Sequence, residues 1–186
     1  MLLFTALGQY WDTQNPHTEE AYWQVTRAKS APFFGATLYV GAMMGGADAT
    51  SAGKLGELGE LYGEMIQIHD DLNDAMAVPA SVDWLQGRFP LPILFAEVVP
   101  HPDQARFRHL RRQVEQADAL VEAQDILIRC GAVSYAIDQL LQRHRQATAL
   151  RPQLHLAQPR VIDQVLEGVI EPVQKLLHQI RAQHQV

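Results

Sequence analysis

The sequence has a single cysteine, Cys130, and its Phe, Trp and Tyr residues together make up only 8% of the 186 residues. One cysteine excludes an internal disulfide and fits a reducing compartment such as the cytoplasm. Basic residues are also scarce, because 15 Lys and Arg stand against 21 Asp and Glu, for a net charge of −6. Without a basic cluster, the sequence argues against nucleic acid as a partner.

The sequence also lacks a long hydrophobic run. The longest apolar stretch, Ala31 to Ala47, is interrupted by Pro32, Thr37 and several glycines. It is shorter than the roughly 20 residues that a helix needs to cross a bilayer. We therefore expect a buried helix here and a protein that is not transmembrane. The apolar N-terminus has no basic leader and no convincing cleavage site, so we do not expect a signal peptide.

Apolar residues are nonetheless frequent enough for one compact core, since they make up 47% of the chain. They recur at helical spacing, and we find no strand-like alternation. The sequence therefore predicts an all-α antiparallel helix bundle. A cap at Thr18 starts one helix, and Thr50 or Ser51 is expected to cap the central one. The expected helical segments are 2–11, 19–31, 33–47, 51–76, 91–99, 102–130, 132–149 and 161–180.

The central segment ends in three carboxylates within five residues, Asp70, Asp71 and Asp74. At about 100° per residue, Asp70 and Asp74 fall roughly 40° apart with Asp71 beside them, so all three can reach one point. Like charges at this spacing repel by roughly 0.2–0.5 kcal/mol per pair. A divalent cation such as Mg²⁺, which prefers carboxylate and phosphate oxygens, removes that repulsion. The alternative is a solvated helix end, but the basic Arg88 one short loop later favours a metal-bound anion.

These residues give the chain a resemblance to the all-trans polyprenyl diphosphate synthases. The second aspartate-rich motif of that family follows a glycine and a glutamine as DDxxD, and residues 63–74 match it with Gln67 in the glutamine place. Four further landmarks occur in the family's order along nearly the whole chain. They are Gly8-Gln9-Tyr10-Trp11-Asp12, Lys29-Ser30, Asp83 with Gly87-Arg88 and Leu91-Pro92, and Gly131 to Ala136.

The resemblance implies an isoprenoid-synthase bundle around a deep cavity and a Mg²⁺-dependent prenyltransferase of isoprenoid biosynthesis. Such an enzyme condenses an allylic prenyl diphosphate with isopentenyl diphosphate. By the same resemblance, Asp70, Asp71 and Asp74 would hold Mg²⁺ on the allylic diphosphate. Lys29, Gln67 and Arg88 would bind the same diphosphate and assist catalysis.

Each of these side chains also has a purely structural interpretation. Lys29 would then be an ordinary surface lysine, and Gln67 a core glutamine bonded to the backbone. Arg88 would simply pair with Asp83. We expect Asp12, in the first landmark, to hold helices together and not to touch substrate.

The sequence departs from the family pattern at one important point, because the first aspartate-rich motif is missing and the chain contains no other DDxxD. We therefore expect residues 1–186 to form a single partial domain, incomplete at its N-terminus and inactive alone. It would be the C-terminal part of a longer synthase, or a subunit that a homodimer mate or partner chain completes with the first motif. Two alternatives remain: a non-catalytic or regulatory subunit that binds prenyl diphosphate, and a helical structural module with an accidental acidic cluster.

Overall fold

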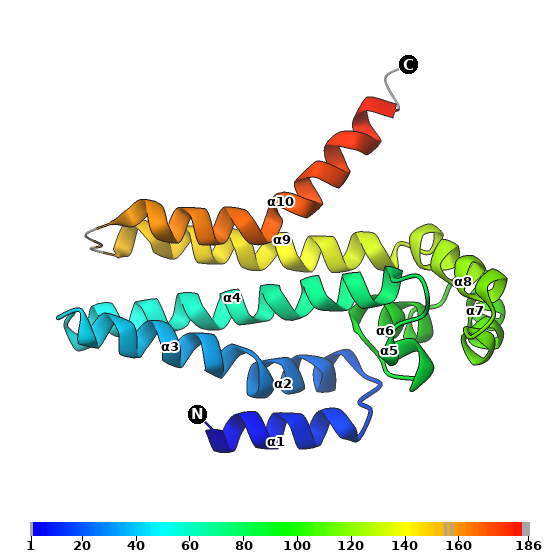
Figure 1. Cartoon of the computed structure of the whole chain (residues 1–186), viewed down its shortest axis with the longest axis horizontal. Coiled ribbons are helices and arrows are strands. Elements are labelled where there is room, and N and C mark those ends of the chain that lie inside the picture. The colour runs from blue at the N-terminus through cyan, green and yellow to red at the C-terminus, as the bar shows by residue number, and fades with distance from the viewer. Residues whose placement is uncertain (1, 155, 157, 184–186) are drawn as a thin grey trace.

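The computed structural model describes residues 2–154, 156 and 158–183, the last ten by their backbone alone. Over these residues it contains helices and no strand, so the all-α prediction is confirmed (Figure 1). The elements are α1 (Leu2–Thr13), α2 (Glu19–Lys29), α3 (Ala31–Met44), α4 (Ala49–Met76), α5 (Val82–Leu85), α6 (Leu91–Val98), α7 (Gln104–Leu110), α8 (Ala117–Arg129), α9 (Ala132–Leu150) and α10 (Pro159–Gln183), with the 3₁₀ turns η1 (Arg111–Gln113) and η2 (Arg151–Gln153).

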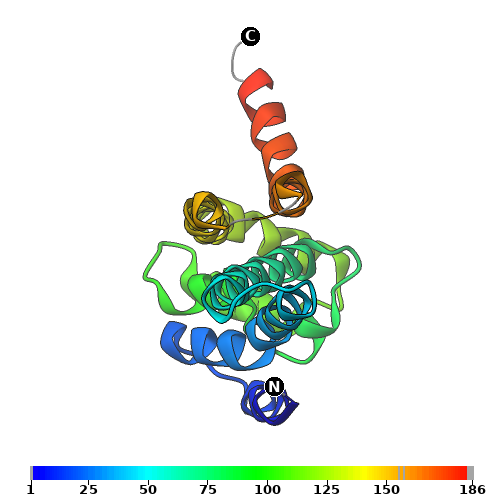
Figure 2. The same ribbon diagram turned by 90° about the vertical axis from the view of Figure 1, so that its left-hand side faces the viewer.

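The long helix α4 lies at the centre of the bundle (Figures 1 and 2). Helix α3 packs along one side of it and α9 along the other, while α1 packs on α2 as an outer layer. The buried core along α4 includes Leu58, Met65 and Ile68. A second core, around Trp84 and Phe107, joins the short helices α5 to α8 at one end of the bundle. The end of α4 that carries the aspartates therefore meets the short helices.

The helix starts follow from side-chain caps. Thr18 caps α2 as predicted, and its Oγ1 accepts a hydrogen bond from the Ala21 N–H at 3.2 Å. The prediction for α4 is wrong, because Asp48 is its cap. The Asp48 carboxylate accepts from the N–H groups of Thr50 (2.9 Å) and Ser51 (3.0 Å). A carboxylate just ahead of the helix can serve two of its free N–H groups at once.

The predicted helix over residues 91–99 is confirmed as α6, whereas the segment 102–130 is not one helix. It divides into α7, η1 and α8. Val114, between η1 and α8, is buried in the second core together with Phe107 of α7. The chain turns here so that α7 and α8 can pack against each other, which two parts of one straight helix could not do.

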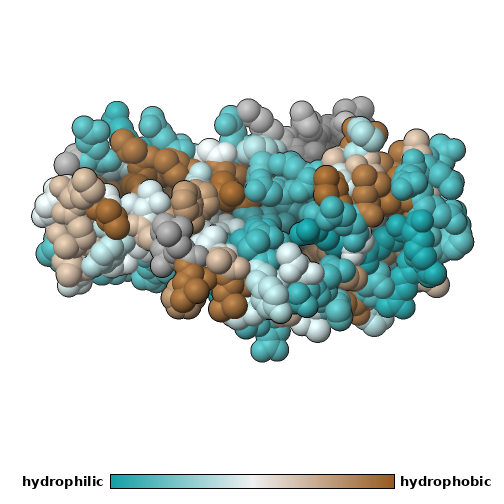
Figure 3. Space-filling view, turned by 60° about the horizontal axis from the view of Figure 1, so that its bottom comes forward, coloured by the Kyte–Doolittle hydropathy of each residue, from teal (hydrophilic) through white to brown (hydrophobic). Residues whose placement is uncertain are grey.

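The prediction that residues 31–47 form a buried helix is wrong. Only Ala31 and Gly35 of α3 are buried, because α3 packs on α4 along one side. Figure 3 brings the face with α1 and α3 forward, and apolar surface gathers on its left half. The exposed apolar side chains of these two helices include Leu3, Phe4, Leu7, Phe33, Tyr39, Val40, Met43 and Met44. Among the described residues, no helix is long and apolar enough to cross a bilayer.

Helices α3 and α4 approach each other to backbone contact. A Cβ atom on Gly59 would lie 2.5 Å from the carbonyl oxygen of Phe34, and one on Gly63 would lie 2.8 Å from the Cα of Ala31. Gly59 and Gly63 of α4 therefore mark a tight helix contact. This contact fixes α4 about two turns before the acidic cluster.

A buried ion pair ties α4 to α9 and α2. The Glu64 carboxylate accepts from Arg143 Nε of α9 at 2.9 Å and from Arg27 Nε of α2 at 3.1 Å. The Arg143 guanidinium lies over the ring of Trp23, 3.8 Å from its centroid. Glu64 and Arg143 are 7% and 8% exposed. The network holds three helices at one level of the bundle.

Helix α10 starts beside α9 and then turns away from it (Figure 1). Pro172 lies inside this helix. Proline has no N–H to donate and its ring crowds the preceding turn, so it bends the helix.

Candidate functional site

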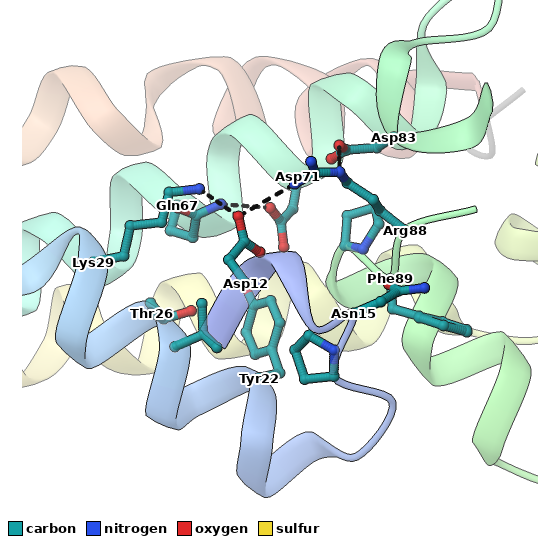
Figure 4. A pocket seen from close by; sticks show the side chains of 13 residues that line it. Asp12, Asn15, Tyr22, Thr26, Lys29, Gln67, Asp71, Asp83, Arg88 and Phe89 are labelled. Carbon is teal, nitrogen blue, oxygen red and sulfur yellow. Dashed lines mark hydrogen bonds and ion pairs between the residues drawn. The ribbon is translucent and has the colours of Figure 1, made fainter. Parts of the chain in front are cut away.

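A polar cavity of about 80 Å³ opens where α1, α2, the C-terminal half of α4 and the segment 83–90 meet (Figure 4). Asp12 of α1 and Arg88 of the 83–90 segment are 76 residues apart in sequence, so only the fold brings them together. The lining residues are Asp12, Asn15, Pro16, Tyr22, Val25, Thr26, Lys29, Gln67, Asp71, Asp83, Arg88, Phe89 and Pro90.

The two predicted basic residues meet on one carboxylate in this cavity. Lys29 Nζ donates to Asp12 Oδ2 at 2.8 Å, and Arg88 Nη1 donates to the same oxygen at 3.3 Å (Figure 4). Arg88 also lies 3.8 Å from Asp83, which is the pairing that its structural interpretation expected. Asp12 links helices as predicted, but it does so inside the cavity. Lys29 faces the cavity and is not an ordinary surface lysine.

Gln67 and Asp71 form the inner wall. Ser30 Oγ donates to Gln67 Oε1 at 2.8 Å, and Gln67 Nε2 donates to Asp71 Oδ1 at 2.8 Å. The second oxygen of Asp71 accepts from the Leu91 N–H at 2.8 Å. Burial raises the pKa of Asp71 to about 7, although these donors oppose the shift. Gln67 thus bonds to side chains, and not to the backbone as its structural interpretation held.

The three carboxylates of the DDxxD motif do not converge on one point. Asp71 is 4% exposed and faces α6, whereas the Asp70 side chain is 62% exposed. Asp70 and Asp74 lie outside the cavity lining. Asp70 and Asp71 are adjacent in sequence and therefore point about 100° apart on the helix. Asp71 points toward the start of α6, where it accepts a hydrogen bond from the Leu91 N–H. Within the described residues, no three His, Cys, Asp or Glu side chains form a ready metal site.

Sequence reasoning missed two residues of the site. Asp83 lines the cavity, and its pKa is raised by burial and then by the charge of Asp74, which identifies these two acids as neighbours. The sequence analysis used Asp83 only as a landmark. Tyr22 is buried, and its pKa is raised first by burial and then by the nearby charge of Asp71. No sequence signal distinguished Tyr22 from an ordinary core tyrosine.

The charges of the lining indicate what the site can hold. Two cations, Lys29 and Arg88, stand against the carboxyl groups of Asp12, Asp71 and Asp83. There is no surplus of positive charge to attract an anion alone. An added divalent cation would reverse this balance, so the arrangement suits a metal and an anion bound together.

Comparison with known proteins identifies the family. The chain matches the family described as polyprenyl synthetase over residues 1–127. The chain belongs to the polyprenyl synthetase family. The matched residues include every residue that lines the cavity.

Two relatives of this chain are prenyl diphosphate synthases. It is 31% identical over 142 residues to a nonaprenyl diphosphate synthase from Mycobacterium tuberculosis, covering 73% of this chain and 42% of that protein. It is 30% identical over 97 residues to a geranylgeranyl diphosphate synthase from Methanosarcina mazei, covering 48% of this chain and 30% of that one. The chain thus spans less than half the length of these relatives.

Solved structures agree on the fold of this chain. A decaprenyl diphosphate synthase from Rhodobacter capsulatus matches with a TM-score of 0.79 at 22% identity, over 92% of this chain and 57% of that one. A geranylgeranyl pyrophosphate synthase from Corynebacterium glutamicum matches with a TM-score of 0.81 at 24% identity, over 91% and 55%. The predicted isoprenoid-synthase bundle is therefore confirmed.

Proposed function

We propose that the chain is the diphosphate-binding part of a Mg²⁺-dependent polyprenyl diphosphate synthase. The intact enzyme would transfer an allylic prenyl group to isopentenyl diphosphate, in the cytoplasm and as a step of isoprenoid biosynthesis. One observation carries this proposal: in a member of this family, Lys29 and Arg88 meet in a cavity beside the acids that end α4. An accidental acidic cluster would have no reason to place one of its members, Asp71, in the same cavity as two cations from distant segments.

The carboxylates of the DDxxD motif are the proposed metal ligands. Mg²⁺ needs only one or two carboxylates, since water and phosphate oxygens complete its octahedral coordination. Asp70 and Asp74 fit this requirement, because they offer hard oxygen atoms close to each other, and Asp74 is also a neighbour of the cavity residue Asp83. Asp71 would have to release Gln67 or the Leu91 N–H before it could bind the ion as well.

The proposed reaction begins when the allylic carbon–oxygen bond breaks and its electron pair leaves with the diphosphate. Bound Mg²⁺ would stabilise the charge that develops on the diphosphate oxygens. Lys29 and Arg88 would donate hydrogen bonds to those oxygens, and Gln67 would orient them. The allylic carbon then bonds to the double bond of isopentenyl diphosphate, which loses a proton to a diphosphate oxygen. Loss of the leaving group is the step that these side chains assist.

The first aspartate-rich motif is proposed to come from another segment or subunit. The 186 residues contain one DDxxD and align with less than half of the related synthases. The exposed apolar side chains of α1 and α3 offer a surface for helices that carry this motif, in a homodimer or with a partner chain. We therefore propose a single partial domain.

Mg²⁺ with inorganic pyrophosphate is expected to stabilise the protein. A ligand present at 100 times its Kd adds about 2.7 kcal/mol to the free energy of unfolding. The double variant Asp70→Asn/Asp74→Asn should lose this gain, because it removes two metal-binding charges. Thermal unfolding followed with Mg²⁺, with pyrophosphate and with both measures the effect.

The matched control is Asp118→Asn/Asp125→Asn, which removes the same charge from the exposed surface of α8. It should respond to Mg²⁺ and pyrophosphate as the unmodified protein does. An equal response from the Asp70→Asn/Asp74→Asn variant would instead favour a structural module.

The 186-residue chain alone is expected to form little or no product from an allylic diphosphate and isopentenyl diphosphate. The physical reason is that the 186 residues contain only one aspartate-rich motif, so the active site would lack the carboxylates of the other. Radiolabelled isopentenyl diphosphate and extraction of the prenyl product measure this. Robust turnover would contradict the partial-domain proposal. Pyrophosphate binding combined with stimulation of a complete synthase would favour the regulatory subunit.

A further inference from the structure

Arg111 reaches from η1 to the back of the segment that carries Arg88. Its Nη2 donates to the carbonyl oxygens of Gly87 at 2.8 Å and Arg88 at 2.6 Å. Its guanidinium carbon lies 3.9 Å from the ring centroid of Phe89. One side chain therefore contacts three consecutive residues of the segment.

This segment forms one wall of the cavity, and the N–H groups of Gly87 and Arg88 donate to the carbonyl oxygens of Trp84 and Asp83, at 3.1 and 2.8 Å. Arg88 and Phe89 both line the cavity (Figure 4). Gly87 has a φ of +65°, so the backbone turns sharply just before Arg88. On the other side, Asn15 Nδ2 donates to the Gly87 carbonyl at 3.0 Å. Arg111 and Asn15 thus hold the turn from opposite sides.

Burying the charge of Arg111 is unfavourable, so stability alone does not explain an arginine at this position. Its side chain is 11% exposed, and its nearest carboxylate is Glu97, at 3.4 Å. Arg108 shares that carboxylate at the shorter distance of 2.7 Å. Among the described residues, none accepts a hydrogen bond from its buried Nε. An apolar side chain of similar volume often serves stability equally well in such a place, but it would remove the Arg111 donor from both carbonyls and leave only Asn15 on that of Gly87.

We propose that Arg111 is a positioning residue that sets where the Arg88 guanidinium meets a diphosphate. It binds the backbone on both sides of the Arg88 Cα, between the Gly87 and Arg88 carbonyls, and stacks on Phe89. A guanidinium whose backbone is held in place loses less freedom when it binds an anion. This inference rests on the proposed function, because it assigns Arg111 a role only through Arg88.

A double-mutant cycle tests the inference, with Mg²⁺ and inorganic pyrophosphate as the probe and titration calorimetry as the measurement. Arg111→Met, which keeps volume and removes the donors, should weaken pyrophosphate binding about tenfold, the equivalent of one hydrogen bond. In an Arg88→Gln background the same change should alter Kd by less than about twofold. An equal loss in both backgrounds would overturn the inference, since a purely structural residue does not depend on Arg88.

Arg108→Met is the matched control, because Arg108 is half exposed and its guanidinium donates to Glu97. It should leave Kd unchanged. If Arg111→Met does not fold, Arg111→Lys, which keeps the charge without the fork of donors, takes its place with the same expected dependence on Arg88. An unmodified protein that binds no Mg²⁺-pyrophosphate would overturn the proposed function as well. Binding that Arg111→Met leaves unchanged would overturn only the role of Arg111.

Discussion

Replacing Glu64 by glutamine is expected to lower the free energy of unfolding by about 3–5 kcal/mol. The change leaves the Arg143 guanidinium buried, 8% exposed, with no carboxylate at its Nε. Its remaining contacts, the ring of Trp23 and the Gln139 oxygens, do not carry a balancing charge. Equilibrium unfolding in urea measures the difference.

Arg27→Gln is the control for this prediction. Arg27 contacts the other oxygen of Glu64, but its side chain is 62% exposed. A solvated ion pair contributes about 0–1 kcal/mol, so this variant should be nearly as stable as the unmodified protein. If both variants lower the free energy of unfolding equally, burial of the Glu64–Arg143 pair would not explain its contribution to stability.

The double variant Gly59→Ala/Gly63→Ala is expected to lose about 2–6 kcal/mol. Each new methyl group would meet α3 backbone atoms at 2.5–2.8 Å, and overpacking of this kind costs about 1–3 kcal/mol per site. Backbone atoms cannot move aside as a flexible side chain does, so α3 must shift away from α4. Urea unfolding measures the loss.

Gly41→Ala/Gly53→Ala is a control with the same chemical change in the same two helices. A Cβ at either position meets nothing within 4 Å. Alanine restricts the unfolded chain and favours the helix, so this variant should gain about 1–2 kcal/mol. If the control loses as much stability as Gly59→Ala/Gly63→Ala, the contact between α3 and α4 would not be the cause of either loss. A shift of α3 would also move Ser30 away from Gln67, so pyrophosphate binding should weaken in the first variant alone.

The helices were predictable because their signals are local. The spacing of apolar residues along α4 and α9 and the cap at Thr18 depend only on neighbours in sequence. The predictions were wrong where contacts between residues distant in sequence, and not local signals, decide the structure. The expected helix over 102–130 is interrupted because α7 and α8 pack against each other, and α3 is exposed because α4 covers only one side.

The sequence by itself determined the all-α class, the resemblance to the family and the set of charged residues at the end of α4. Tertiary structure alone decided how those residues are arranged. Asp12 joins Lys29 to Arg88, 76 positions away, and the Leu91 N–H turns Asp71 inward while Asp70 stays exposed. The physical reason is that helix periodicity fixes the angle between side chains on one helix, whereas their partners come from other segments, whose positions only packing sets.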